Sequence, residues 1–140
     1  MQKQFESRYT TLINAPVEKV WEALTNPAFV KQYFFNTDLV TDWVKGHPIF
    51  FRGAWEGQPY EDKGIVLEYS ENKKLSYSYL SSWSGMEDRE ENYLYVSYEV
   101  QELENGTELT VIQTNYDNEK VEHSSENWKT VIEGMKKLLE

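Results

Sequence analysis

The C-terminal segment, residues 117–140, constrains the fold most, because it has the pattern of one amphipathic helix. Its apolar residues recur at helical spacing and share one face: Trp128, Val131, Ile132, Met135, Leu138 and Leu139. Charged residues occupy the opposite face. An apolar stripe of this kind must be buried against another apolar surface, and the only comparable one is the aromatic-rich region between residues 34 and 115. We therefore expect this helix to pack on a sheet.

The N-terminal region predicts one strand followed by two short helices. Residues 5–13 alternate with period two, which is typical of a strand. Pro16 is suited to a helix start, and Val17, Val20, Trp21 and Leu24 then give one apolar helical face. Because a residue before proline is disfavoured in the α region, Asn26-Pro27 should end this helix. A second helix is predicted from Pro27 to about Gln32.

The central region predicts short strands separated by turns. These strands are expected at residues 38–40, 49–52, 65–69, 75–79, 93–103 and 108–115. Gly53, Gly57 and Pro59 are expected to interrupt the chain after the second of them. Asn105-Gly106 predicts a hairpin turn, since both residues accept positive φ. Residues 81–92 are acidic and predict a loop.

This order of elements indicates an α+β fold in a single domain spanning residues 1–140. The chain has no cysteine, so no disulfide framework or thiolate metal site is expected. The N-terminus lacks an apolar signal region, and no run approaches the ~18 apolar residues of a membrane span. We therefore expect a cytoplasmic protein.

Three segments carry a resemblance to a known superfamily. They are residues 13–25 (INAPVEKVWEALT) with Pro27, residues 64–68 (GIVLE) and residues 128–135 (WKTVIEGM). Over essentially its whole length, the chain resembles the SRPBCC (START-like, helix-grip) superfamily. Within it, the chain is most similar to stand-alone bacterial relatives of the activator of the heat-shock protein 90 ATPase.

The resemblance has implications for both fold and function. It implies a curved antiparallel sheet of about six to seven strands that grips the C-terminal helix, with two short helices after the first strand. It also implies a hydrophobic cavity between helix and sheet, of the kind that holds lipids, sterols or polyketides. The name of the family further implies a role in the stress response.

Aromatic side chains are the candidate lining of such a cavity, since 15% of the chain is aromatic. The predicted ligand-binding residues come from strand faces, from loops near strand ends and from the C-terminal helix. They are Trp43, Phe51, Trp55, Tyr77, Tyr79, Trp83, Tyr93, Tyr95, Trp128, Val131, Ile132 and Met135. Ordinary core packing is the alternative for each of them. Gly134 on the helix indicates either a close approach of the sheet backbone or room for a ligand.

Catalytic, metal and cofactor sites are not predicted. His47 and His123 lack the spacing of a metal pair, and no phosphate-binding or nucleophile motif is present. Glu68, Glu99 and Gln113 stand among apolar strand residues, so an inward carboxylate remains open. The net charge of −10 argues against nucleic acid or an anionic membrane as a partner.

Three functions are therefore considered, of which non-enzymatic binding of a small hydrophobic molecule leads. The first alternative is a co-chaperone that stimulates a heat-shock ATPase, which rests on the family name. The second is a cyclase, dehydratase or hydrolase that uses the same cavity and needs an inward acid or base. A monomer and a homodimer are both compatible with the sequence.

Overall fold

The computed structural model describes residues 5–34, 36–81, 86–115 and 118–140. The strands are β1 (Phe5–Ile13), β2 (Asp38–Val40), β3 (Pro48–Trp55), β4 (Gln58–Ser70), β5 (Lys74–Tyr79), β6 (Leu94–Leu103) and β7 (Gly106–Asn115). The helices are α1 (Val17–Thr25), α2 (Pro27–Tyr33), α3 (Asn118–Leu139) and a 3-10 turn, η1 (Glu90–Asn92). The predicted α+β class is confirmed.

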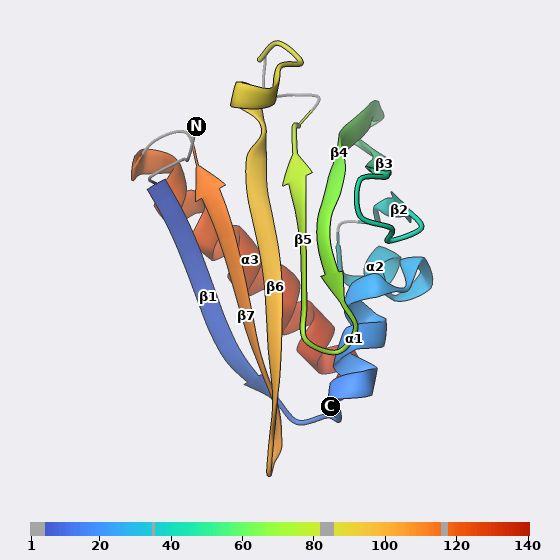
Figure 1. The fold of residues 1–140 in the computed structure, drawn as a ribbon, viewed down its shortest axis with the longest axis vertical. Helices are drawn as coiled ribbons and strands as arrows, with labels where there is room; N and C mark the ends of the chain where they lie inside the picture. Colours follow the sequence, from blue (N-terminus) through green and yellow to red (C-terminus); the bar gives the residue numbers. More distant parts are fainter. Residues whose placement is uncertain (1–4, 35, 82–85, 116–117) are drawn as a thin grey trace.

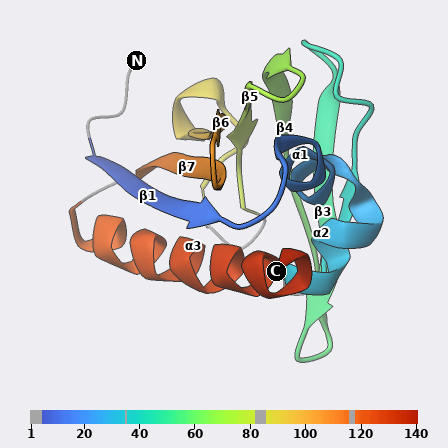
Figure 2. The same cartoon turned by 90° about the horizontal axis from the view of Figure 1, so that it is seen from below.

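All seven strands form one antiparallel sheet in the order β1-β7-β6-β5-β4-β3-β2. The sheet curves around α3, which lies along β1 and β7 (Figures 1 and 2). The two short helices cover the same concave side nearer to β3 and β4 (Figure 2), and α2 also contacts β2. This arrangement is the helix-grip fold that the sequence predicted.

The helix α3 buries the face that its sequence pattern indicated. Trp128, Val131, Ile132 and Met135 are all buried in the main core. Leu138, which belongs to the predicted stripe, is instead 44% exposed. Leu139, the next residue, packs against the core, so the predicted apolar stripe holds except at Leu138.

The helices α1 and α2 are separated by a single residue with two roles. The backbone N–H of Asn26 donates to Glu22 O of α1 at 2.8 Å, and its side chain accepts from the Ala28 N–H of α2 at 2.9 Å. Pro27 occupies the first helical position, where its missing N–H has no consequence. This cap fixes the sharp change of direction that places α2 beside α3.

Of the interruptions expected at Gly53, Gly57 and Pro59, only the one at Gly57 is confirmed, because Gly53 and Pro59 belong to the continuous β3–β4 hairpin. Only Glu56 and Gly57 turn, and both have positive φ, as a two-residue hairpin turn of the primed kind requires. Gly53 stays in the strand. The Tyr60 hydroxyl lies only 2.6 Å from where a Cβ of residue 53 would stand, so glycine here makes room for a ring.

The β6–β7 turn is displaced by one residue from its predicted position. Leu103 pairs with Gly106, so Glu104 and Asn105 form the turn. Gly106 has φ +145, whereas Asn105 has no positive φ. A Cβ at residue 106 would lie 2.4 Å from Ile13 O of β1. Residue 106 is therefore a glycine because β1 approaches its backbone too closely for a side chain.

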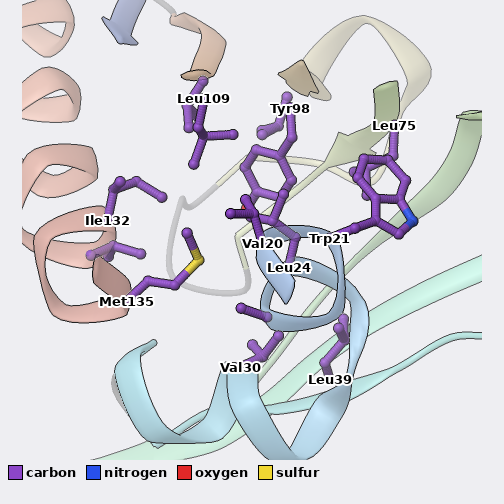
Figure 3. Packing of buried hydrophobic residues seen from close by; sticks show 14 of the residues in the cluster. Val20, Trp21, Leu24, Val30, Leu39, Leu75, Tyr98, Leu109, Ile132 and Met135 are labelled. Atoms are coloured by element: carbon purple, nitrogen blue, oxygen red, sulfur yellow. The ribbon is translucent and has the colours of Figure 1, made fainter. Parts of the chain in front are cut away.

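Most of the buried apolar residues form one cluster shared by the sheet and all three α-helices. Figure 3 shows side chains from α1, α2, α3 and the strands converging on this core, with Tyr98 of β6 among them. This core is continuous from α3 to the α1–α2 pair.

Candidate functional site

A small pocket lies between the α1–α2 pair and the concave face of the sheet. Its walls come from both helices, from four strands and from two connecting segments: Leu24, Val30, Tyr33, Phe34, Leu39, Trp43, Phe51, Tyr77 and Tyr98. Its volume is about 10 Å³, roughly the space of one water molecule. Side chains therefore fill most of the space between the layers, and a larger occupant requires some of them to move.

The sheet side of the pocket is a row of interlocked aromatic rings. Phe51 and Tyr77 have ring centroids 5.3 Å apart, and Tyr77 and Tyr98 pack edge to face at 6.1 Å. Trp128 of α3 continues the row at 5.7 Å from Tyr98, and its indole N–H donates to Gln113 Oε1 at 2.7 Å. Tilted and edge-to-face pairs of this kind are favourable, so each ring in this wall stabilises the position of its neighbours.

Phe34 forms part of the opposite wall and follows α2 directly. It is half-buried, with its ring 6.1 Å from Phe51 and 5.9 Å from Trp128. Because Phe34 belongs to a short connection rather than to a helix or strand, its displacement does not break regular structure. It is a candidate for the side chain that moves.

Trp43 closes the pocket from the connection between β2 and β3. Its backbone has φ +58, which is uncommon for a residue other than glycine. Its indole N–H donates to Thr25 O at 3.1 Å, and its ring stacks on Tyr69 at 5.8 Å. Trp43 is half-buried, so it joins the pocket to the molecular surface.

A carboxylate holds the connection that carries Trp43. Asp42 accepts from the Val44 N–H at 3.0 Å and lies 2.6 Å from His47 Nδ1. The Val44 hydrogen bond and the His47 contact hold the pKa of Asp42 below its usual range. These contacts fix the loop independently of the Trp43 side chain.

Three tyrosine hydroxyls lie inside or beside the pocket. The hydroxyl oxygens of Tyr77 and Tyr98 are 3.3 Å apart, and the Tyr33 hydroxyl donates to Ala23 O at 2.8 Å. Burial raises the pKa of all three tyrosines well above its usual range. They therefore stay neutral at physiological pH and act as hydrogen-bonding groups rather than as bases.

An inward carboxylate exists on the concave face, although it is not one of those considered from the sequence. Asp62 is 8% exposed, lies opposite Phe51 in the β3–β4 register and accepts from the Tyr79 hydroxyl. Burial and the charge of Asp62 raise the pKa of Tyr79. Glu68 and Glu99 are exposed, and Gln113 points inward to Trp128. Asp62, Gly64 and Val66 are spaced two residues apart and so share one strand face. This spacing could have identified Asp62 from the sequence as an inward-facing carboxylate.

The structure brings together some of the predicted ligand-binding residues. Trp43, Phe51 and Tyr77 line the pocket. Tyr79, Trp128, Val131, Ile132 and Met135 belong to the adjoining core. Trp83 and the side chains of Trp55 and His123 lie outside what the structure describes.

Tyr93 and Tyr95 do not face α3. Tyr95 alternates with the buried Leu94 and Val96, so it lies on the other face of the sheet. Tyr93 precedes β6, and its hydroxyl donates to Asp88 Oδ1 at 2.6 Å. Burial and this carboxylate raise the pKa of Tyr93 to about 12. The inward aromatic residue of β6 is Tyr98.

Sequence reasoning missed six of the lining residues: Leu24, Val30, Tyr33, Phe34, Leu39 and Tyr98. Tyr98 could have been found, because it follows Leu94 and Val96 with period two. The others lie on or next to short elements whose packing depends on the tertiary fold.

Two further features bear on the kind of site. Within residues 5–34, 36–81, 86–115 and 118–140, no group of three or more histidine or acidic residues is placed to hold a metal ion. Among the helices that the structure describes, none combines the length and the apolar character needed to cross a bilayer.

A comparison with protein families identifies the family of this chain. The model of the family described as "Activator of Hsp90 ATPase homolog 1-like protein" matches residues 14–140. A solution structure of a protein from Cytophaga hutchinsonii is 42% identical, with a TM-score of 0.85 over 99% of this chain and 96% of that chain. No curated protein shows significant similarity.

More distant structures share the fold. The Aha1 dimer from Colwellia psychrerythraea is 19% identical, with a TM-score of 0.75 over 98% of this chain and 97% of that one. A protein from Chromobacterium violaceum is 16% identical, with a TM-score of 0.81 over 96% of each chain. At these identities the likeness concerns the fold alone.

Proposed function

The chain belongs to the family of Activator of Hsp90 ATPase homolog 1-like proteins. We propose that it binds a small hydrophobic molecule between its α1–α2 pair and the sheet, and that it does not catalyse a reaction of this molecule. The observation that carries this proposal is the convergence of nine uncharged side chains on one pocket. Ligand sites are commonly concave, mostly apolar and supplied with a few polar groups.

Entry of such a ligand requires a local rearrangement, because ligand pockets commonly have 300 Å³ or more and this one has about 10 Å³. We infer that Phe34 and Trp43 move, since both belong to connections between elements. The ring row of Phe51, Tyr77 and Tyr98 then remains as the fixed wall.

Burial of apolar surface supplies enough free energy for this mode of binding. At roughly 25 cal/mol per Å², a ligand that buries about 300 Å² gains about 7 kcal/mol before association costs and side-chain displacement are subtracted. Micromolar affinity is thus attainable without a charged contact. The uncharged lining fits an interaction of this kind.

A methyl-labelled NMR titration with fluorene, a rigid hydrocarbon, tests the proposal. We expect the methyl resonances of Leu24, Val30 and Leu39 to shift in a saturable way, because these residues line the pocket. Leu109 and Val111 are equally buried but lie outside the lining, so they serve as controls. Absence of saturable shifts, or shifts confined to exposed residues, would contradict the proposal.

An enzymatic role is the second candidate, favoured by Asp62. This buried carboxylate accepts from the Tyr79 hydroxyl and lies beside Phe51, on the margin of the pocket. A cyclase or hydrolase would use such a pair as acid and base. Recovery of a chemically altered ligand from the wild type, but not from Asp62→Asn, would favour this candidate over simple binding.

Assembly and a protein partner also remain proposals. A relative with the same fold is described as a dimer, which fits a homodimer of this chain. Stimulation of a heat-shock ATPase is suggested only by the name of the family. Sedimentation of the purified protein and an ATPase assay with the chaperone of its own host test these two points separately.

A further inference from the structure

The polar centre of the pocket is the contact between Tyr77 and Tyr98. The two residues stand diagonally on neighbouring strands, since Tyr77 pairs with Val96 and Leu75 pairs with Tyr98. Both are deeply buried, at 2% and 6% exposure, and their hydroxyl oxygens are 3.3 Å apart. The aromatic rings carry these hydroxyls into a surrounding of apolar side chains.

The hydroxyl groups of Tyr77 and Tyr98 carry one proton more than the hydrogen bond between them uses. Two hydroxyl groups carry two protons, and the contact between them uses only one, whichever oxygen donates. The Tyr33 hydroxyl is committed to Ala23 O. Among the residues that the structure describes, the second proton of the Tyr77–Tyr98 pair has no acceptor. A buried donor without an acceptor is unfavourable, because it has given up its hydrogen bond to water without replacing it.

We propose that the Tyr77–Tyr98 pair is a hydrogen-bonding anchor for the ligand, and that it selects apolar molecules that carry one neutral acceptor oxygen, such as a carbonyl or an ether. This inference rests on the proposed binding function and specifies its ligand. Because the remaining hydroxyl proton can only be donated, the ligand group that meets it must be an acceptor rather than a donor. A carboxylate is disfavoured, because no lining residue carries a positive charge to pair with it.

Two probes with one skeleton isolate this hydrogen bond. Fluorene and 9-fluorenone have the same three fused rings and differ by a methylene group in place of the carbonyl group. We expect calorimetry to show that the wild-type protein binds fluorenone about tenfold more tightly than fluorene, the gain of one net hydrogen bond. Equal affinities would overturn the anchor and leave the binding function intact. Failure of both probes to bind would remove both proposals.

Variants assign the preference to the pair. Tyr77→Phe or Tyr98→Phe alone leaves one hydroxyl that can still donate, so each single variant should keep a preference for the ketone. The double variant Tyr77→Phe/Tyr98→Phe should bind the two probes equally. Tyr95→Phe is the matched control, because Tyr95 lies on the other face of the sheet. A preference that survives in the double variant would overturn the proposal.

Infrared spectroscopy gives a second test that needs no variant. The carbonyl stretch of bound fluorenone should lie at lower frequency than in a hydrocarbon solvent, because a donated hydrogen bond weakens the C=O bond. An unshifted band in the wild-type complex would contradict the anchor even if the double variant failed to fold.

Discussion

Gly134 of α3 faces a different neighbour from either one expected from the sequence. A Cβ built at residue 134 would lie 3.6 Å from Cβ of Tyr33. Apart from the helix backbone and the chain neighbours, no other heavy atom of the described residues would lie within 4 Å of it. Neither the sheet backbone nor open space is therefore the reason for this glycine. This distance is an ordinary van der Waals contact, so residue 134 adjoins Tyr33, which lines the pocket, and has room for an alanine.

Gly134→Ala should be accommodated and should raise the free energy of unfolding by up to about 1 kcal/mol, because alanine is the better helix former. Gly134→Leu should instead push Tyr33 toward the pocket and weaken fluorene binding. Urea unfolding and calorimetry of the two variants check this pair of outcomes. Destabilisation by alanine, or unchanged binding with leucine, would contradict the contact described.

Gly64 of β4 is constrained far more strictly than Gly134. A Cβ at this residue would stand 1.7 Å from Ser78 O, a backbone atom of β5. We expect Gly64→Ala to lower the free energy of unfolding by at least about 2 kcal/mol, since the strands must separate locally. Gly134→Ala is the matched control in the same unfolding series. Equal stability of the two variants would show that β4 and β5 do not approach so closely.

At the scale of elements, the connection between β2 and β3 determines access to the pocket. Its backbone is held by the contacts of Asp42, so removal of the Trp43 ring should leave the loop in place. We expect Trp43→Ala to bind fluorene several-fold more tightly, because the ligand no longer displaces an indole. Trp43→Phe should give an intermediate affinity. Weaker binding by the alanine variant would show that the indole contacts the ligand instead.

Sequence periodicity predicts elements well where one face is long and regular. The helices α1 and α3 were predicted with their buried faces, apart from Leu138. The β3–β4 hairpin was missed, because Gly53 marks a ring that packs above the strand, rather than a turn. A local pattern cannot distinguish these two uses of glycine.

The candidate site was predictable only in part, for a related reason. Phe51, Tyr77 and Trp43 stood out as aromatic residues on or near strands, and all three line the pocket. Val30 and Phe34 belong to the apolar side of a helix of seven residues and its end, and this pattern does not indicate which surface that side contacts. Their role depends on how α2 packs against the sheet.

For the molecule as a whole, buried tyrosines predict a limit to stability at alkaline pH. Burial raises the pKa of Tyr33, Tyr77 and Tyr98 above the ordinary value of 10.0. The unfolded chain therefore loses these protons first. The corresponding stability is fully present below about pH 10 and declines as the pH rises toward the folded-state values.

Urea unfolding between about pH 8 and pH 11 tests this linkage. Each of the three tyrosines should contribute a slope of up to about −1.4 kcal/mol per pH unit to the free energy of unfolding above about pH 10. A free energy that stays constant to pH 11 would mean that these hydroxyls ionise as readily in the folded protein as in the unfolded chain.

The crystal structure of the 9-fluorenone complex tests the central claim most directly, since it locates the ligand and its oxygen together. We predict that the rings lie between α2 and the Phe51–Tyr77 wall, with Phe34 and Trp43 displaced and the carbonyl oxygen within hydrogen-bond distance of Tyr77 or Tyr98. Fluorenone on the outer face of the sheet, with the pocket still closed, would contradict the account.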